Sequence, residues 1–355
     1  MIEPGATIGI LGGGQLGRMT ALAAISLGYR CHVFCPLKDS PAKQATPLAT
    51  TAAYDNKLAL GRFAKAVDVV TFEFENVPAD TAEFLAERRP VRPGPNALRI
   101  AQDRIKEKDF LRAIGVATAP YQAVGSEAEL RRASETIGPR AILKTTRMGY
   151  DGKGQHALRA DSDLAAAWRG FGSNDGILEG FVEFACEVSV IIARSETGKT
   201  ATYAPVENQH VNHILDTTIA PARVTPEIAM RAEAIARHIA EKLDLVGLLA
   251  VEMFVTHEGE VLVNELAPRP HNSGHWTIDA CYTSQFEQLV RAICGLPLGS
   301  PERHSDAAMK NLIGANIEKW REAANDPLQK IHLYGKDQAL PGRKMGHVTK
   351  LIPRR

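Results

Sequence analysis

Short apolar runs alternate with amphipathic segments along the first hundred residues. Residues 7–11 form an apolar run that suits a buried parallel strand, and residues 15–27 have the spacing of a helix that ends before Gly28. Further strands are predicted at 31–34 and at 67–74, where the chain reads VDVVTFEF. This alternation of strand and helix predicts an α/β unit of the doubly wound kind.

The pattern changes after a cluster of glycine and proline, RRPVRPGPN. A helix predicted over 97–114 leads out of the first unit to Gly115. The sequence SEAE then opens a helix at Ser126 as a capping box, and a strand follows at 141–145. Later helices are predicted to begin at Thr225 and Ser284. The last fifty residues, with several Gly and Pro, are predicted to be a small β-rich segment.

Composition narrows the class of protein. The 355 residues are 45% hydrophobic, and 42 basic residues balance 41 acidic ones to a net charge of +1, so neither a nucleic acid nor a membrane is an expected partner. The first residues lack the zones of a signal peptide, and we expect a cytoplasmic protein. The five cysteines show no C-x-x-C spacing, which favours reduced thiols over a zinc site.

The first glycine turn, GGGQLG, poses a question about its ligand. Gly12, Gly14 and Gly17 fit the dinucleotide pattern G-x-G-x-x-G. That pattern also needs an acid at the end of the second strand, where this chain has Cys35 and its nearest acid, Asp39, lies beyond a proline. The turn therefore predicts a helix N-terminus aimed at some ligand, and the case for NAD is weakened. At the end of another strand, TFEFENVP offers two further acids, Glu73 and Glu75.

A second glycine-rich stretch, LKTTRMGYDGKGQ, lacks the spacing of a Walker A loop. It reads instead as strand, loop and strand, in which backbone amides can bind phosphate oxygens while Lys144 and Lys153 add charge. The alternative is a plain hairpin turn with solvated lysines.

The stretch AVEMFVTHEGEVLVNELAPRPHNSGH contains two strand-like runs, 251–256 and 261–266. A two-residue turn at Glu258-Gly259 places Glu252 directly opposite Glu265. Facing carboxylates in an apolar hairpin repel each other, and a divalent cation reverses that penalty, so the pair predicts a magnesium–nucleotide site. The alternative is a slipped register with both acids in solvent.

Two polar segments follow the acid pair. APRPHNSGH presents Arg269, His271 and Asn272 on a proline-stiffened segment that suits a planar anion, such as a carboxylate or carbonate. A metal pair of His271 with His275 is the alternative, which the prolines and Gly274 oppose because they disfavour a helix. Near the end, YGKDQALPGRKMGH gathers cations that suit a phosphate monoester or, alternatively, form a solvated basic tail: Lys336, Arg343, Lys344 and His347.

Five motifs together resemble the ATP-grasp ligases and, within them, the 5-(carboxyamino)imidazole ribonucleotide synthase family of purine biosynthesis: GILGGGQLGRM, TFEFENVP, KTTRMGYDGKGQ, ENQHVNHIL and NELAPRPHNSGH. The resemblance implies a fold of α/β and α+β parts. An N-terminal Rossmann-like pre-ATP-grasp domain would span 1–105, an ATP-grasp domain 106–299 with subdomains at about 121–185 and 186–299, and a small C-terminal domain 300–355. It also implies a homodimer.

The resemblance assigns roles to particular residues. ATP would be bound by Arg104, Lys144, Gly149, Tyr150, Asp151, Gly152, Lys153, Gly154, Gln155, Glu179, Gly180, Phe181, Val182, Glu187, His210, Asn264 and Glu265. Mg²⁺ would be held by Glu252 and Glu265. Aminoimidazole ribonucleotide would contact Gln15, Leu16, Glu73, Tyr150, Asp151, Lys336, Arg343 and Lys344. Bicarbonate and its phosphorylated form would meet Arg269, His271 and Asn272, with Asp151 a candidate proton acceptor for the amine. Many relatives read E-x-N on the second metal strand, but this chain reads Glu265-Leu266-Ala267, which leaves the ligands of a second Mg²⁺ open.

The implied activity is the ATP-dependent carboxylation of the ribonucleotide through carboxyphosphate, with the loop 149–155 closing over the site as a lid. Three other functions compete. A relative that uses formate on glycinamide ribonucleotide carries an acid in the first glycine turn, where this chain has Gln15. An NAD-dependent dehydrogenase is disfavoured by Cys35 and the acid pair, and a non-catalytic nucleotide-binding regulator leaves Arg269 and His271 without a role.

Overall fold

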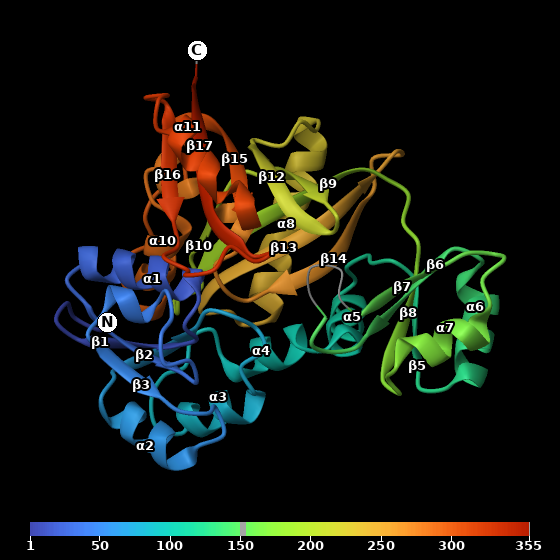
Figure 1. Cartoon of the computed structure of the whole chain (residues 1–355), viewed down its shortest axis with the longest axis horizontal. Coiled ribbons are helices and arrows are strands. Elements are labelled where there is room, and N and C mark those ends of the chain that lie inside the picture. The colour runs from blue at the N-terminus through green and yellow to red at the C-terminus, as the bar shows by residue number, and fades with distance from the viewer. Residues whose placement is uncertain (150–153, 355) are drawn as a thin grey trace.

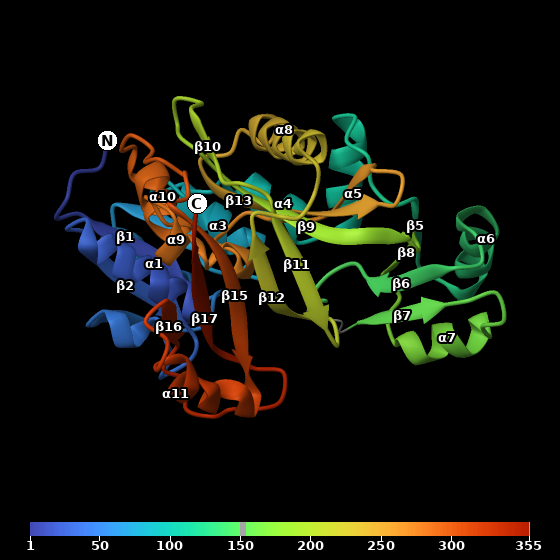
Figure 2. The ribbon, with the colours of Figure 1, turned by 90° about the horizontal axis from the view of Figure 1, so that it is seen from above.

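Three β-sheets form the framework of the protein, which we describe from a computed structural model covering residues 1–149 and 154–354. A parallel four-stranded sheet lies at the N-terminal end, and a small antiparallel four-stranded sheet lies at the opposite end of the molecule. A nine-stranded sheet lies between them and carries the C-terminal strands (Figures 1 and 2). No helix in the described part of the chain is both long enough and apolar enough to span a bilayer.

The N-terminal unit is the doubly wound sheet that the alternation predicted. Its strands lie in the order β3-β2-β1-β4 and all pair in parallel. The strand predicted over 67–74 corresponds to β4 and is shorter than predicted, because four of its residues pair with β1. The elements are β1 Thr7–Leu11, α1 Gln15–Ser26, β2 Arg30–Cys35, the 3₁₀ turn η1 Lys43–Ala45, β3 Leu48–Thr51, α2 Lys57–Lys65, β4 Val69–Phe72, α3 Ala79–Ala86 and α4 Pro95–Ala101.

The single helix predicted over 97–114 is wrong: the chain forms two helices, α4 and α5 Arg104–Ala113. Asp103 separates them, because it adopts extended backbone angles and its carboxylate accepts hydrogen bonds from the amides of Ile105 (3.1 Å) and Lys106 (3.3 Å). An Asp followed by helix-forming residues is an N-cap signal, which the apolar periodicity of the segment concealed.

The small sheet has the order β5-β8-β6-β7 and is covered by two helices, α6 and α7. The N-cap hydrogen bond of the predicted capping box forms in α6, since the Ser126 side chain accepts from the amide of Glu129 at 3.2 Å. A compact apolar core that includes Leu130, Leu143 and Leu178 joins the helices to the sheet. The elements are β5 Tyr121–Val124, α6 Glu127–Ile137, β6 Ala141–Thr145, β7 Gln155–Leu158, α7 Leu164–Phe171 and β8 Gly176–Gly180.

The central sheet runs β14-β13-β9-β11-β12-β15-β17-β16, with β10 paired to β9. The C-terminal segment is β-rich, as predicted. Its strands extend the central sheet because β15 pairs with β12. The elements are β9 Phe184–Arg194, β10 Thr200–Thr202, β11 Val206–Val211, β12 Ile214–Ala220, α8 Pro226–Lys242, β13 Gly247–Thr256, β14 Val261–Ala267, η2 Asn272–Gly274, α9 Thr277–Ala280, α10 Gln285–Cys294, β15 Ser305–Ile313, η3 Gly314–Lys319, α11 Trp320–Ala323, β16 Gln329–Leu333 and β17 Lys344–Pro353.

The β13–β14 hairpin places Glu252 opposite Glu265, as predicted, but by a different route. The loop has three residues, closed by a hydrogen bond from the amide of Thr256 to the carbonyl of Glu260, and Gly259 takes a positive φ of 82°. A bulge beside Glu252 then leaves Asn264 as an extra residue on β14. The longer loop and the bulge cancel in register, so the alternative of a slipped register is excluded.

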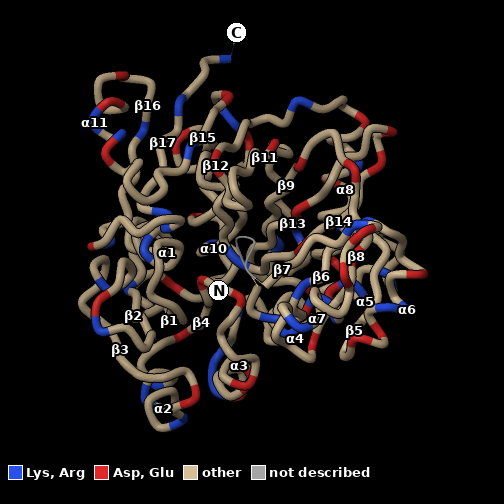
Figure 3. The backbone as a smooth tube through the Cα atoms, turned by 45° about the vertical axis from the view of Figure 1, so that its right-hand side comes forward, with Lys and Arg blue, Asp and Glu red and all other residues tan. Residues whose placement is uncertain are grey.

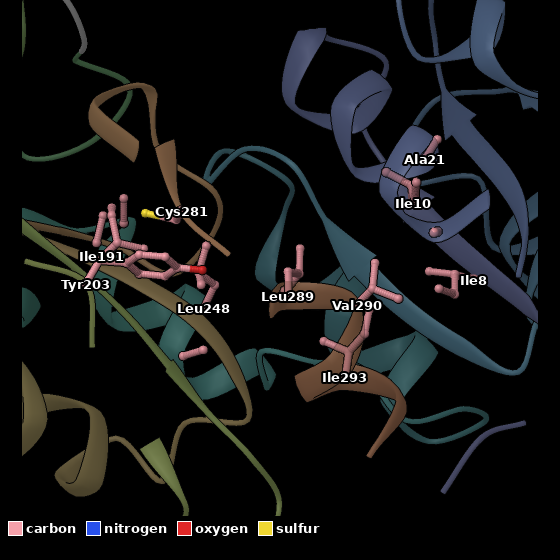
Figure 4. Close-up of a cluster of buried hydrophobic side chains, with 14 of the residues drawn as sticks. Ile8, Ile10, Ala21, Ile191, Tyr203, Leu248, Cys281, Leu289, Val290 and Ile293 are labelled. Atoms are coloured by element: carbon pink, nitrogen blue, oxygen red, sulfur yellow. The ribbon is translucent and has the colours of Figure 1, made fainter. Parts of the chain in front are cut away.

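Helix α10 joins the N-terminal unit to the central sheet. It contacts α1 and also packs on β9 and β13. Figure 4 shows Leu289 and Ile293 of this helix between Ile8 of the N-terminal sheet and Leu248 of the central sheet, and all four side chains are buried in one cluster. The shared core fixes these two units relative to each other, so residues from both can build one site.

Candidate active site

Several of the predicted site residues form ion pairs with one another or with neighbouring side chains. Segments coloured for Lys and Arg and segments coloured for Asp and Glu are both scattered over the backbone in the view of Figure 3. A charged ligand is therefore met by specific pairs of side chains, and these are described below from the N-terminal turn to the C-terminal strands.

The first glycine turn holds a carboxylate of its own chain. Glu73, directly after β4, accepts hydrogen bonds from the amides of Gly14 and Gly17, the latter at 2.8 Å. A Cβ atom at Gly12 or Gly14 would lie within 3 Å of the Glu73 side chain, so these glycines are required for the buried acid. The acid that NAD binding needs at the end of β2 is absent, since β2 ends at Cys35.

Two amides of the turn are left for a ligand. Glu73 takes those of Gly14 and Gly17, and within the described residues no hydrogen bond involves the amides of Gln15 and Leu16 between them. Burial raises the pKa of Glu73, and the two turn amides, Arg269 and Lys336 oppose that rise. The turn therefore lies within electrostatic reach of both the anion segment and the C-terminal cations.

A buried lysine and carboxylate network lies between the small sheet and the central sheet. Lys144 of β6 donates to Glu179 of β8 at 2.8 Å, and Lys108 of α5 lies 4.0 Å from the same carboxylate. Lys108 also donates to the carbonyl of Asn264 at 2.9 Å. Lys144, Glu179 and Asn264 were predicted to bind ATP, and the structure brings all three together around Lys108.

Two further pairs on the central sheet and α5 come from the predicted nucleotide set. His210 Nδ1 lies 2.9 Å from Glu187, which is on the neighbouring strand. Burial alone would lower the pKa of His210, but the hydrogen bond and charge of Glu187 raise it above its ordinary value. Arg104, the first residue of α5, lies 3.4 Å from Glu265. Arg104 and Lys108 thus connect α5 to β14, the strand that carries Glu265.

The facing acids of the hairpin have an excess of negative charge. Burial and then Glu265 raise the pKa of Glu252 to about 8. This raised pKa means that the folded protein resists placing a second negative charge here, which a cation would reverse. Glu252 and Glu265 therefore fit the predicted divalent cation, because they place two carboxylate groups face to face and Mg²⁺ prefers oxygen ligands.

The anion segment after β14 presents one charged and two polar side chains. Arg269 pairs with Glu75, an acid that the sequence placed at the end of β4 without assigning it a role. His271 Nε2 lies 3.1 Å from Glu252. Asn272 is 9% exposed, and within the described residues neither its amide nitrogen nor its amide oxygen has a hydrogen-bond partner. A buried amide without a protein partner is unusual, and both ends of this one are available to another group.

Hydrogen bonds fix the tautomer of His271. Its Nδ1 accepts from the hydroxyl of Ser273 at 2.8 Å and from the Ser273 amide at 3.3 Å, and that hydroxyl accepts from Ser189 at 2.7 Å. The proton is then on Nε2, which lies 3.1 Å from a carboxylate oxygen of Glu252. Burial, followed by the charge of Arg269, lowers the pKa of His271 well below its ordinary value. His271 is therefore a neutral hydrogen-bond donor at neutral pH.

The metal pair of His271 with His275, considered as an alternative, does not form. His275 Nδ1 lies 3.1 Å from the amide nitrogen of Gln285, whereas His271 Nε2 contacts Glu252, so the two rings serve different partners. Both lie beside the 3₁₀ turn η2, as the prolines and Gly274 suggested.

The C-terminal cations lie at the ends of β16 and β17. Lys336 donates to the carbonyl of Lys344 at 2.7 Å, and Arg343 donates to the carbonyl of Gln338 at 3.0 Å. Burial and then Arg343 lower the pKa of Lys336 to about 8. His347 is buried and bonded to Tyr334, so it supports the strands and does not join the cation cluster.

Some predicted residues stand apart from these pairs. Phe181 is 43% exposed, with Arg140 over its ring, and it follows β8 together with Val182. Gly180 ends β8, and Gln155 begins β7 beside Gly154. Gly149 precedes the residues Tyr150, Asp151, Gly152 and Lys153, which lie outside the described part of the chain. The ligand roles of all these residues, and the closing lid, stay predictions.

The sequence interpretation missed the charged inner face of α5. Arg104, Glu107, Lys108 and Leu111 have the spacing i, i+3, i+4 and i+7 of one helix face, and the last three are buried. Glu107 accepts from the amide of Leu266 at 2.7 Å, and burial raises its pKa to about 8. A helix stripe that mixes leucine with charges was the available signal, and of these residues Arg104 alone was assigned a role from the sequence.

Comparison with known families and proteins agrees with this geometry. Three family models match: the ribonucleotide synthetase preATP-grasp domain over residues 5–102, the ATP-grasp domain over 109–286 and the phosphoribosylaminoimidazole carboxylase C-terminal domain over 307–354. The N5-carboxyaminoimidazole ribonucleotide synthase of Brucella melitensis is 48% identical over 99% of this chain and 98% of its own. The bifunctional purine synthesis protein purC/E of Dictyostelium discoideum is 47% identical over 99% of this chain, which spans 37% of that longer protein.

Solved structures show the same likeness. A crystal structure of an N5-carboxyaminoimidazole ribonucleotide synthetase in complex with ADP superposes with a TM-score of 0.96 at 45% identity, covering 99% of this chain and 93% of the other. The Aspergillus clavatus synthase, in complex with ADP and 5-aminoimidazole ribonucleotide, gives a TM-score of 0.92 at 32% identity, covering 98% and 94%.

Proposed function

The chain belongs to the N5-carboxyaminoimidazole ribonucleotide synthase family of ATP-grasp ligases, and we infer from this membership how its clustered side chains carry out the reaction. The activity is the ATP-dependent carboxylation of 5-aminoimidazole ribonucleotide in purine biosynthesis. The finer statements below concern the carboxyl donor, the metal and the residues that hold each group.

We propose that the carboxyl donor is bicarbonate and that it binds at the segment after β14. The observation that supports this is the convergence of Arg269, His271 and the unpartnered amide of Asn272 beside the acid pair. A guanidinium, a neutral N–H donor and a primary amide together suit a small planar anion with three oxygens. Among the described residues, no comparable set of side chains is arranged for binding NAD.

In the first step the γ-phosphoryl group of ATP is transferred to an oxygen of bicarbonate, which gives carboxyphosphate and ADP. Lys144 lies in the network around Glu179, where its ammonium group can exchange that carboxylate for ATP phosphates. Arg269 and the His271 N–H stabilise the anion. Glu252 and Glu265 would hold Mg²⁺, which supplies neutralisation of the phosphate charge when bound.

In the second step the exocyclic amine of the ribonucleotide forms a bond to the carboxyl carbon while phosphate leaves, and the amine loses one proton. The ribonucleotide phosphate is assigned to Lys336, Arg343 and Lys344. The amides of Gln15 and Leu16 are available from the other side, next to Glu73. Asp151 is our candidate for the proton acceptor, although it lies outside the described residues.

We further propose a cytoplasmic homodimer that has neither nucleic acid nor membrane as a partner. The near-neutral net charge of +1 supports the absence of a polyanion partner, and the dimer rests on the resemblance to the family. Light scattering of the purified protein measures its mass directly, and a mass of one chain at working concentration would refute the dimer.

The direct test of function is phosphate release from Mg-ATP by the purified protein, with and without aminoimidazole ribonucleotide, in buffer that contains or lacks bicarbonate. We expect release to require both compounds and to yield an acid-labile carboxylated ribonucleotide. Release that ignores this ribonucleotide but responds to glycinamide ribonucleotide and formate would instead identify the formate-using relative. The absence of any ATP turnover would favour a binding protein.

A further inference from the structure

Gln285, the first residue of α10, is fully buried and lies against the anion segment. Its amide oxygen accepts from the backbone amide of His271 at 2.9 Å, and its amide nitrogen donates to the backbone carbonyl of His271 at 2.7 Å. The same nitrogen lies 3.1 Å from His275 Nδ1. One side-chain amide therefore pairs with both main-chain groups of a single residue, as a neighbouring strand would.

The backbone around this contact is also adapted to it. A Cβ atom at Gly274 would lie 2.5 Å from the Gln285 amide oxygen, so only glycine admits the side chain there. The backbone N–H of Gln285 donates to the Thr277 hydroxyl at 2.9 Å, and that hydroxyl donates to the backbone carbonyl of Gly274 at 2.6 Å. Side chain and main chain of Gln285 thus hold the same turn, 271–277, from two directions.

The contact determines where the His271 ring lies. His271 Nδ1 depends on Ser273, and Nε2 reaches Glu252 at 3.1 Å only while its backbone is fixed. Because Gln285 bonds both main-chain groups of His271 and lies on the helix between two sheets, it sets the position of the ring through the backbone. We propose that Gln285 is a positioning residue, which orients His271 toward the carboxyl donor through the His271 backbone. This inference rests on the proposed function.

The test uses Gln285→Glu in the full-length protein. The new side chain has the same shape and still accepts from the His271 amide, but its ionised form cannot donate to the His271 carbonyl or to His275. Because small misplacements of a reacting group cost about 10²-fold in rate, we expect kcat to fall by about 10- to 100-fold and the KM for bicarbonate to rise. The KM for ATP should stay within about twofold, since Gln285 does not contact the nucleotide residues.

Helix α10 supplies a matched control one turn farther on. Gln288 is also fully buried, and its amide donates to the carbonyl of Gly299 at 2.7 Å and accepts from its amide at 2.8 Å. Gln288→Glu therefore makes the same isosteric change in the same kind of clamp, on a segment outside the site. Both variants should lose similar stability in urea, and only Gln285→Glu should change the bicarbonate KM and kcat.

The pH dependence separates positioning from a general loss of structure. A protonated carboxyl recovers one donor, so the ratio of variant to wild-type kcat should rise as pH falls from about 8.5 to about 6.5 for Gln285→Glu and stay flat for Gln288→Glu. The inference is overturned alone if wild-type turnover requires bicarbonate but Gln285→Glu matches wild type, or if both variants change alike. Wild-type protein without bicarbonate-dependent turnover overturns the proposed function and this inference with it.

Discussion

At the scale of single residues, Glu252 lies between a neutral histidine ring and a second carboxylate. Its carboxylate lies 3.1 Å from His271 Nε2 and faces Glu265 across the hairpin, and its pKa is raised to about 8 by burial and by that second acid. The pairing of these acids was predicted from a two-residue turn and is confirmed, although a three-residue loop and a compensating bulge produce it. The tautomer of His271 was not predicted, because it depends on Ser189, which donates to Ser273 from a strand remote in sequence.

Replacing Glu252 by Gln should separate stability from activity. The amide keeps an oxygen for the His271 donor but removes the like charge opposite Glu265, so in metal-free buffer the free energy of unfolding should rise by about 1–2 kcal/mol. ATP turnover should fall by about 100-fold or more, because one of the two carboxylates proposed for Mg²⁺ is lost.

Urea unfolding and phosphate release check this pair of effects, with Glu258→Gln at the exposed hairpin tip as the control. Mg-ATP should stabilise wild type and the control but not Glu252→Gln. A Glu252→Gln protein that keeps its Mg-ATP stabilisation would show that the acid pair does not hold the metal.

The buried His347 ring makes a prediction about pH. Burial, and then the charges of His275 and His332, lower its pKa well below the ordinary 6.5 in the folded protein. The unfolded chain therefore binds a proton near pH 6.5 that the folded chain refuses, so this stability is complete above pH 6.5 and is lost as pH falls below it. Between pH 6.5 and 5.5 the loss from one such ring is about 1 kcal/mol.

His347→Asn should remove this loss while keeping a hydrogen-bonding side chain near Tyr334, its partner at 2.8 Å. Unfolding free energies of wild type and variant, measured in urea at both pH values, should differ in their change by about 1 kcal/mol. The exposed His304→Asn should follow wild type. Parallel curves for His347→Asn and wild type would mean that the folded ring titrates normally.

At the scale of elements, local signals predicted what local forces determine. The strand 7–11, the capping box at Ser126 and the strand 141–145 follow from side-chain spacing and caps, and they form where predicted. The helix 97–114 failed because a single cap at Asp103 overrides continuous apolar spacing. The pairing of Glu252 with Glu265 was confirmed although the loop was misassigned, because a bulge beside Glu252 offsets the extra loop residue.

The turn between β1 and α1 supports a prediction about stability. Gly14 has a φ of −80°, which suits any residue, but a Cβ there would lie 2.7 Å from Glu73 Oε1. Gly14→Ala should displace the buried carboxylate from its amide donors and cost about 2–4 kcal/mol.

Gly61→Ala is its control in the same unit, because nothing lies within 4 Å of the new methyl group and alanine favours helix α2. That variant should gain up to about 1 kcal/mol, as measured by urea unfolding of both proteins. Equal effects of the two substitutions would show that contact with Glu73 does not decide the need for glycine in the turn.

At the scale of the whole molecule, the family resemblance predicted the units, but not how they are joined. The near-neutral net charge of the chain and the order of its motifs along the sequence agree with the three parts that the family models match. The pairing of β12 with β15 and the position of α10 between two sheets are long-range contacts, and no periodic pattern in the sequence encodes them. The buried charges of α5 are a second such link, because they matter only once β8 and β14 surround them.

Lys108 is the residue through which this second link is tested. Its side chain is 1% exposed, donates to Asn264 of the central sheet and lies 4.0 Å from Glu179 of the small sheet. Lys108→Met should fill the space but leave Glu179 with Lys144 as its remaining cationic contact within 4 Å among the described residues, and leave the Asn264 carbonyl without its donor. Because Glu179 keeps Lys144 while the buried Asn264 carbonyl loses its donor, we expect a loss of about 1–3 kcal/mol.

Arg112→Met tests the alternative that any charge removed from α5 has this effect. Arg112 lies one turn after Lys108 and pairs with Asp109, but both side chains are at least half exposed, so its loss should cost under about 1 kcal/mol. Lys108→Met should also raise the KM for ATP, because Lys144 then remains held by Glu179 instead of meeting phosphate. If urea unfolding and ATP kinetics changed equally in the two variants, the buried network would not be what couples the small sheet to the metal strand.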